Sequence, residues 1–139
     1  MDAADPEVVE ALRATDLFSS LSRRTLNKVA RQAQVVHHPA GKQITAQGEG
    51  GVGFHLITAG SATVMVGGRP RMDLGPGDYF GEISLIDGKP RSATVTVTTD
   101  LTVIFIVSWV FTPLLDEEKE LTKALLLVMC ARLRGAENE

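Results

Sequence analysis

F-G-E-I-S-L-I-D-G-K-P-R-S-A-T-V, residues 80–95, is the most informative segment of this chain. Gly81 and Glu82 open a short apolar turn, and a Pro-Arg-Ser-Ala run then leads into β-branched residues. An ionised carboxylate only accepts hydrogen bonds, so Glu82 suits a hydroxyl group, whereas the guanidinium of Arg91 suits an anion. The spacing predicts a small loop with a hydroxyl acceptor at one end and a cation at the other.

The segment around this stretch, residues 35–107, is rich in short β-branched runs separated by glycine turns. Many short strands with regular turns favour an antiparallel sandwich or barrel. Gly67-Gly68 between two of the runs is typical of a hairpin. The expected strands are 44–46, 54–58, 62–66, 72–74, 93–98 and 102–107.

Helical signals lie at both ends of the chain. Asp5 followed by Pro6 indicates one helix start and Ser22 a second, because a capping side chain accepts a hydrogen bond from a free backbone N–H. Near the carboxyl end we expect a short helix over 109–115, then a longer one capped by Asp116 and stopped by Gly135.

These elements predict one α+β domain over residues 1–139. Its centre is an antiparallel β-sandwich, or jelly roll, flanked by N-terminal and C-terminal helices. The expected parts are helices over 1–34, the sandwich over 35–107 with a binding segment at 80–93, and helices over 108–135.

The final helix is apolar on all sides from Leu125 to Ala131. A helix with one buried face needs fewer apolar residues than this. Either the helix docks deep in its own domain, or a second face is buried in a homodimer. The expected core stripe consists of Leu126, Met129, Cys130 and Leu133.

Composition limits the class of protein. The chain has 139 residues, 44% of them hydrophobic and 22% charged, and a formal net charge of -3. No run of lysines and arginines stands out, which argues against nucleic-acid binding. A single cysteine indicates a reducing compartment. No apolar run approaches the roughly 20 residues of a membrane span, and the N-terminus does not read as a signal peptide. We therefore expect a cytoplasmic protein with no membrane partner.

The ordered set of Gly81-Glu82, Pro90-Arg91-Ser92-Ala93 and the preceding Gly75-Pro76-Gly77-Asp78 resembles the cyclic nucleotide-binding domain family. In that family, a segment of this kind is the phosphate-binding cassette, and we use the name cassette for residues 80–93. The resemblance extends over nearly the whole chain through Pro39-Ala40-Gly41, Gly48-Glu49, residues 54–57, Gly60 and the terminal helices.

The resemblance implies a regulatory module that senses a ligand and performs no catalysis. Arg91 matches the family residue that holds the phosphate, and Glu82 the residue that holds the ribose 2′-hydroxyl. Gly81 lets the backbone approach the phosphate, and Ser92 adds a hydroxyl. The expected ligand is cAMP, with cGMP open because Ser92 does not decide between them. The full set of expected ligand-binding residues is Gly81, Glu82, Ile83, Ser84, Arg91, Ser92 and Ala93.

The base needs a flat apolar pocket. By strand parity Ala62, Val64 and Leu74 are candidates for it, and each of them is equally compatible with plain core. The final helix carries no aromatic side chain to cover the base. The lid remains open: it is an aliphatic residue, an arginine such as Arg132, a partner subunit, or it is absent. We expect the output to be movement of the C-terminal helix, acting on an unidentified protein effector.

Two other classes stay open. One is a degenerate domain that has lost its ligand and serves as a dimerisation or protein-interaction scaffold. The other is a cupin-like metalloenzyme, but His37 and His38 are adjacent and point to opposite faces of a strand, and His55 has apolar neighbours. We expect no metal. The remaining expectations are a buried core role for Phe105, Trp109 and Phe111, and an inert packing role for Cys130.

Overall fold

The computed structural model describes residues 4–45, 53–81 and 93–137. Contacts divide the chain into two compact units. The sheet unit is Ala33–Thr112, and the helical unit combines Met1–Gln32 with Pro113–Glu139. The expectation of one domain with helices at both ends stays a prediction.

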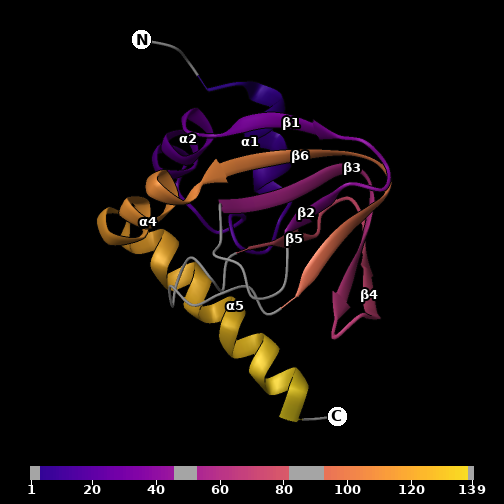
Figure 1. Ribbon diagram of the computed structural model, residues 1–139. Coiled ribbons are helices and arrows are strands. Elements are labelled where there is room, and N and C mark those ends of the chain that lie inside the picture. Colours follow the sequence, from indigo (N-terminus) through magenta and orange to yellow (C-terminus); the bar gives the residue numbers. More distant parts are fainter. Residues whose placement is uncertain (1–3, 46–52, 82–92, 138–139) are drawn as a thin grey trace. The chain divides into compact units, whose positions relative to one another are not determined.

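In its described residues, the sheet unit is built on six antiparallel strands (Figure 1). Its main path has the order β1-β6-β3-β4, with β2 paired to β6 and β5 paired to β3. This arrangement confirms the predicted antiparallel β-architecture. The bounds are β1 Gln34–His38, β2 Gln43–Thr45, β3 Gly53–Val66, β4 Arg69–Leu74, β5 Tyr79–Phe80 and β6 Thr94–Val107.

Two pairs of expected strands are each one long strand. Residues 54–58 and 62–66 both belong to β3, and residues 93–98 and 102–107 merge, apart from Ala93, into β6. Gly60 does not end the strand as expected. It adopts a φ of +84°, the register against β6 shifts around it, and an added Cβ would lie 2.1 Å from the carbonyl oxygen of Asp100. A bulge at a glycine thus allows the strand to continue where the sequence suggested a turn.

Strands β1 and β5 were missed by the sequence analysis. β5 has only two residues, too few to show any alternation. β1 places His37 outward and buries His38, which confirms that the two histidines face opposite sides. The Gly67-Gly68 hairpin between β3 and β4 is confirmed, and both glycines adopt the positive φ that a tight hairpin turn needs.

An apolar cluster lies in the sheet unit. Phe111 is fully buried as expected, and Phe105 is partly buried against the cluster. The expectation for Trp109 is wrong, because its side chain is 74% exposed. The buried members of the cluster are Ile57, Ala62, Leu74, Phe80, Val95, Val97, Leu101 and Val103.

The first two helices begin where their caps predict. Helix α1 spans Pro6–Arg13, and the side chain of Asp5 accepts a hydrogen bond from the backbone N–H of Glu7. Helix α2 spans Arg23–Arg31, and the side chain of Ser22 accepts one from the backbone N–H of Thr25. Local capping chemistry therefore sets both helix starts.

The C-terminal helices differ from their expected bounds. Helix α4 spans Ser108–Glu117 and contains Asp116, so the expected start of the longer helix at Asp116 is wrong. Helix α5 spans Lys119–Glu137 and continues past Gly135. An αL glycine stops a helix only where the chain turns away, and here the chain remains helical beyond it.

The buried face of α5 is not the expected stripe. Leu126 and Leu133 are 61% and 62% exposed, and Cys130 is exposed as well. The expected packing role of Cys130 is therefore wrong, and Met129 is only half-buried. In a helix apolar on all sides, periodicity alone does not select the face that tertiary contacts bury. The buried positions of α5 are Leu121, Ala124, Leu125 and Val128.

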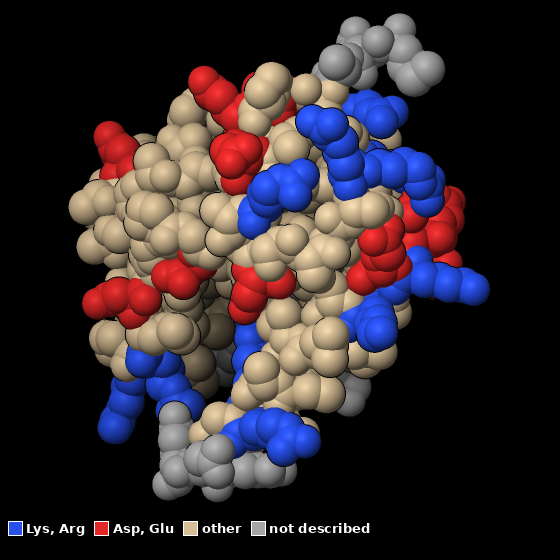
Figure 2. All heavy atoms as spheres, turned by 180° about the vertical axis from the view of Figure 1, so that it is seen from behind, with Lys and Arg blue, Asp and Glu red and all other residues tan. Residues whose placement is uncertain are grey.

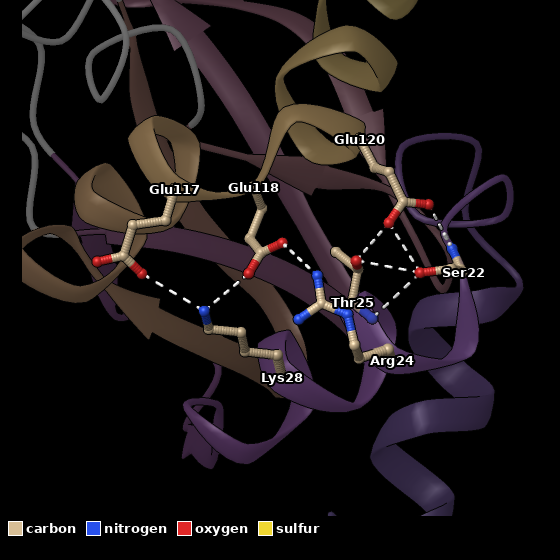
Figure 3. Close-up of polar contacts among 7 residues, drawn as sticks. All are labelled: Ser22, Arg24, Thr25, Lys28, Glu117, Glu118 and Glu120. Atoms are coloured by element: carbon tan, nitrogen blue, oxygen red, sulfur yellow. Dashed lines mark hydrogen bonds and ion pairs between the residues drawn. The ribbon is translucent and has the colours of Figure 1, made fainter.

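A group of polar contacts joins α2 to the junction of α4 and α5 within the helical unit (Figure 3). Lys28 Nζ lies 2.7 Å from Oε1 of Glu118, whose side chain is 6% exposed. Glu120 accepts hydrogen bonds from the backbone N–H and hydroxyl of Ser22, at 2.9 and 2.7 Å, and from the hydroxyl of Thr25. We call these five residues the polar clamp.

Candidate functional site

The turn before the cassette is bound to strand β3. The side chain of Asp78 accepts a hydrogen bond from the backbone N–H of Gly75 at 2.8 Å. The N–H of Gly77 donates to the carbonyl oxygen of Ile57, and the N–H of Ile57 donates to that of Asp78, both at 2.9 Å. These bonds fix the course of the chain just before β5.

Strand β5 then holds the start of the cassette against β3. His55 pairs with Phe80, and Leu56 with Tyr79. Gly81 follows with a φ of +100°, a conformation that residues with a Cβ rarely adopt. The backbone therefore turns at Gly81, immediately before the predicted ribose-binding residue.

The far end of the cassette is held by the same strand. Ala93 precedes β6, whose first residues pair with the last part of β3, Thr94 opposite Met65 and Val95 opposite Val64. Strand β3 thus carries both ends of the cassette, one near its beginning and one near its end.

The predicted ligand residues Glu82, Ile83, Ser84, Arg91 and Ser92 lie outside the described residues. Gly81 and Ala93, which flank them, are described, and both are half-buried. The structure therefore describes the two ends of the cassette and the sheet that supports them.

The three candidates for the base pocket lie together. Ala62 pairs with Leu74 across β3 and β4, and Val64 pairs with Met72 two residues further along each strand. Alternate residues of a strand share a face, so these four side chains lie on one face of the sheet. Ala62 and Leu74 are buried in the apolar cluster, and Val64 packs against it.

Met72 belongs to the same face and was missed. Its side chain is 57% exposed, which is unusual for a large apolar residue beside a buried cluster. The sequence did hold a signal for Met72, because it lies two residues before Leu74 and alternate residues of a strand share a face. Arg132, the candidate for the lid, lies on the exposed side of α5 in the helical unit, and its role stays a prediction.

The histidines differ in environment. His37 is exposed, and its Nδ1 lies 3.0 Å from the hydroxyl of Thr102. Burial lowers the pKa of the His38 imidazole, and the charges of Lys42 and His37 lower it further. His55 is buried and packs between two phenyl rings. Among the residues that the structure describes, His, Cys, Asp and Glu form no group that could hold a metal ion.

Charges of both signs are mixed on the face seen from behind in Figure 2, with blue and red side chains next to each other.

In the described part of the chain, no helix is long and apolar enough to cross a membrane.

Comparison with known proteins identifies the family. The family model described as cyclic nucleotide-binding domain matches residues 35–118. A cAMP-dependent protein kinase regulatory subunit of Aspergillus niger is 37% identical over 94 residues, which cover 66% of this chain and 23% of that protein.

Two solved structures share the fold. The catabolite activator protein of Thermus thermophilus has a TM-score of 0.79 and 28% identity over 88% of this chain and 60% of its own. The regulatory domain of Toxoplasma gondii PKA, solved with cAMP, has a TM-score of 0.71 and 28% identity over 78% of this chain and 43% of its own. The chain thus spans less than two thirds of each of these relatives. With the fold, the cassette motif and the matched residues in agreement, the chain belongs to the cyclic nucleotide-binding domain family.

Proposed function

We propose that this chain is a regulatory module that binds a cyclic nucleotide, cAMP in preference to cGMP, and catalyses no reaction. The relatives support this proposal, since one is a regulatory subunit of a cAMP-dependent kinase and another was solved with cAMP. The predicted compartment is the cytoplasm, and the predicted output is directed at a protein effector.

The observation that carries the proposal is the anchoring of both cassette ends on β3. His55 pairs with Phe80 at one end and Met65 with Thr94 at the other, and Gly81 adds a backbone turn that favours glycine. A segment whose two ends are held by one sheet is well suited to present fixed ligand contacts. In the proposed site Arg91 and the backbone N–H groups after Gly81 bind the phosphate, and Glu82 accepts the ribose hydroxyl. Ile83, Ser84, Ser92 and Ala93 complete the contacts.

The base is proposed to lie on the apolar face formed by Ala62, Val64 and Leu74. Exposed Met72 extends this face, so that the base has an accessible apolar surface to cover. The identity of the lid stays open in the proposal: an aliphatic residue, an arginine such as Arg132, whose guanidinium plane can stack on a base, a partner subunit or no lid at all.

The signal is proposed to leave through the C-terminal helices. Within the sheet unit, Phe111 of α4 stacks on Phe54 of β3 with ring centroids 5.3 Å apart. The ring of Phe54 also lies 5.4 Å from that of Tyr79 in β5. A rearrangement of the cassette therefore has a direct path of packed rings from β5 to α4. A ligand shifts such an equilibrium by its differential affinity for the two states, typically by about 1–3 kcal/mol.

Calorimetric titration with cAMP and cGMP side by side tests the proposal. Arg91→Ala is expected to weaken cAMP binding by about 2–5 kcal/mol, because the buried phosphate loses its charge partner. Arg69→Ala, on exposed β4, is the matched control and should bind as the wild type does. Equal affinity of the Arg91 variant and the wild type would refute the site.

The second candidate function, a dimerisation scaffold, is favoured by one observation. Leu126, Leu127 and Leu133 of α5 are 60–62% exposed, and a homodimer through this helix would cover them. Analytical ultracentrifugation of the wild type and of Leu126→Lys/Leu133→Lys tests the dimer. A thermal-shift experiment without response to either nucleotide would favour a scaffold that binds no ligand.

A further inference from the structure

His55 is a buried, titratable side chain to which the proposed ligand contacts give no role. It lies in β3 with 5% of its surface exposed. Its imidazole is stacked on the ring of Phe80, with centroids 4.6 Å apart and planes inclined by 9°. On another side it meets the ring of Phe105 at 4.8 Å and 38°. A planar ring therefore supports Phe80, the residue directly before Gly81.

The position of Phe80 depends strongly on such contacts. Strand β5 has two residues, so that few backbone hydrogen bonds hold it to the sheet. Phe80 is 8% exposed and belongs to the apolar cluster. Because the two rings lie nearly parallel, the His55 ring restricts the tilt of Phe80 in a way that a flexible aliphatic side chain does not.

We propose that His55 is a positioning residue. Its ring holds Phe80 and Gly81 in place and thereby positions the start of the proposed ribose acceptor, Glu82, relative to the ligand. The inference rests on the proposed function, because it concerns the contact between Glu82 and the ribose 2′-hydroxyl. Gly81 separates Phe80 from Glu82, and its φ of +100° is a conformation that residues with a Cβ rarely adopt. The placement of Phe80 and the turn at Gly81 together set where the chain leaves β5.

The test compares cAMP with 2′-deoxy-cAMP, which lacks the hydroxyl. In the wild type, loss of a hydrogen bond to a carboxylate is expected to weaken binding about tenfold. His55→Leu removes the planar ring at similar volume, and the ratio of the two affinities should fall toward one. His55→Phe retains a planar ring and should retain the ratio. Leu101→Ala is the control for general destabilisation, since it opens the same cluster away from β5, and it should leave the ratio unchanged.

The outcomes separate the two proposals. A wild type that binds neither nucleotide would overturn the proposed function and the positioning role with it. A wild type that discriminates, with a His55→Leu variant that discriminates equally well, overturns the positioning role alone. If the leucine variant does not fold, His55→Gln, which also lacks the ring, takes its place, and an unchanged ratio there has the same meaning.

Discussion

Lys28 Nζ lies 2.7 Å from Oε1 of Glu118, a carboxylate that is almost fully buried between α2 and the start of α5. Arg24 approaches the other carboxylate oxygen at 3.6 Å from an exposed position. Burying a charge is costly unless it is paired, so this contact determines whether Glu118 is tolerated.

Glu118→Gln is therefore expected to lower Tm by about 3–6 °C, because Lys28 loses its nearest partner. Glu117→Gln is the matched control, since that side chain is 60% exposed and 3.5 Å from the same Lys28 nitrogen. An exposed pair contributes little, and its loss should be barely detectable. Equal shifts in Tm for the two variants would contradict the role of burial.

Glu120 makes the polar clamp sensitive to acid. Hydrogen bonds from Thr25 and Ser22 hold the pKa of the Glu120 carboxyl below its usual 4.5. A carboxyl whose pKa is lowered in the folded state stabilises the protein above its unfolded-state pKa, and this contribution is lost as the pH falls through the folded-state value. The Tm difference between the wild type and Glu120→Gln should therefore be constant near neutral pH and shrink below about pH 4.5. A difference that is constant down to pH 3 would refute the prediction.

His38 is expected to make the stability of the protein depend on pH in a second, higher range. Burial lowers its pKa from 6.5, so the folded protein takes up the proton less readily than the unfolded chain. Stability is then expected to fall as the pH drops below 6.5 and to stop falling once the folded-state pKa is passed. His38→Gln should remove this part of the pH dependence of Tm, and His37→Gln should retain most of it, because burial is the largest cause of the shift. The reverse pattern would contradict the assignment to His38.

Gly60→Ala is expected to destabilise the protein by about 2–4 kcal/mol, measured by urea unfolding. The added Cβ would lie 2.1 Å from the carbonyl oxygen of Asp100, and φ is +84°. Gly41 has a similar φ of +90°, but a Cβ added there would meet no atom within 4 Å. Gly41→Ala therefore isolates the cost of the backbone conformation and should destabilise the protein by about 1 kcal/mol. If the two variants cost the same, the contact with Asp100 is not the cause.

The sequence predicted features that depend on local chemistry. The caps at Asp5 and Ser22 and the Gly67-Gly68 turn are each set by a few neighbouring residues, and all three were found. The antiparallel fold followed from the short β-branched runs and their glycine turns, and the family from the ordered cassette motif. The continuity of β3 through Gly60 was not predicted, because it depends on a register shift against β6, a strand some 40 residues away in the sequence.

The sequence also did not predict which face of a helix is buried. Trp109 and Leu126 are apolar and were expected in the core, yet both are exposed. Apolar character alone does not determine burial, which depends on the elements that pack against each face. Similarly, parity identified Ala62, Val64 and Leu74 as neighbours, whereas the contacts of Glu82 and Arg91 remain predictions.

The attachment of both cassette ends to β3 separates the chemistry of the site from the stability of its support. Lengthening a loop whose ends are already held costs little, since each doubling adds only about 0.6 kcal/mol of closure entropy. We therefore expect changes in the number and type of the residues between Gly81 and Ala93 to leave the core of the sheet intact. A single strand can in this way support cassettes with different ligand preferences, and exchange of the loop alone is a practical route to altered specificity.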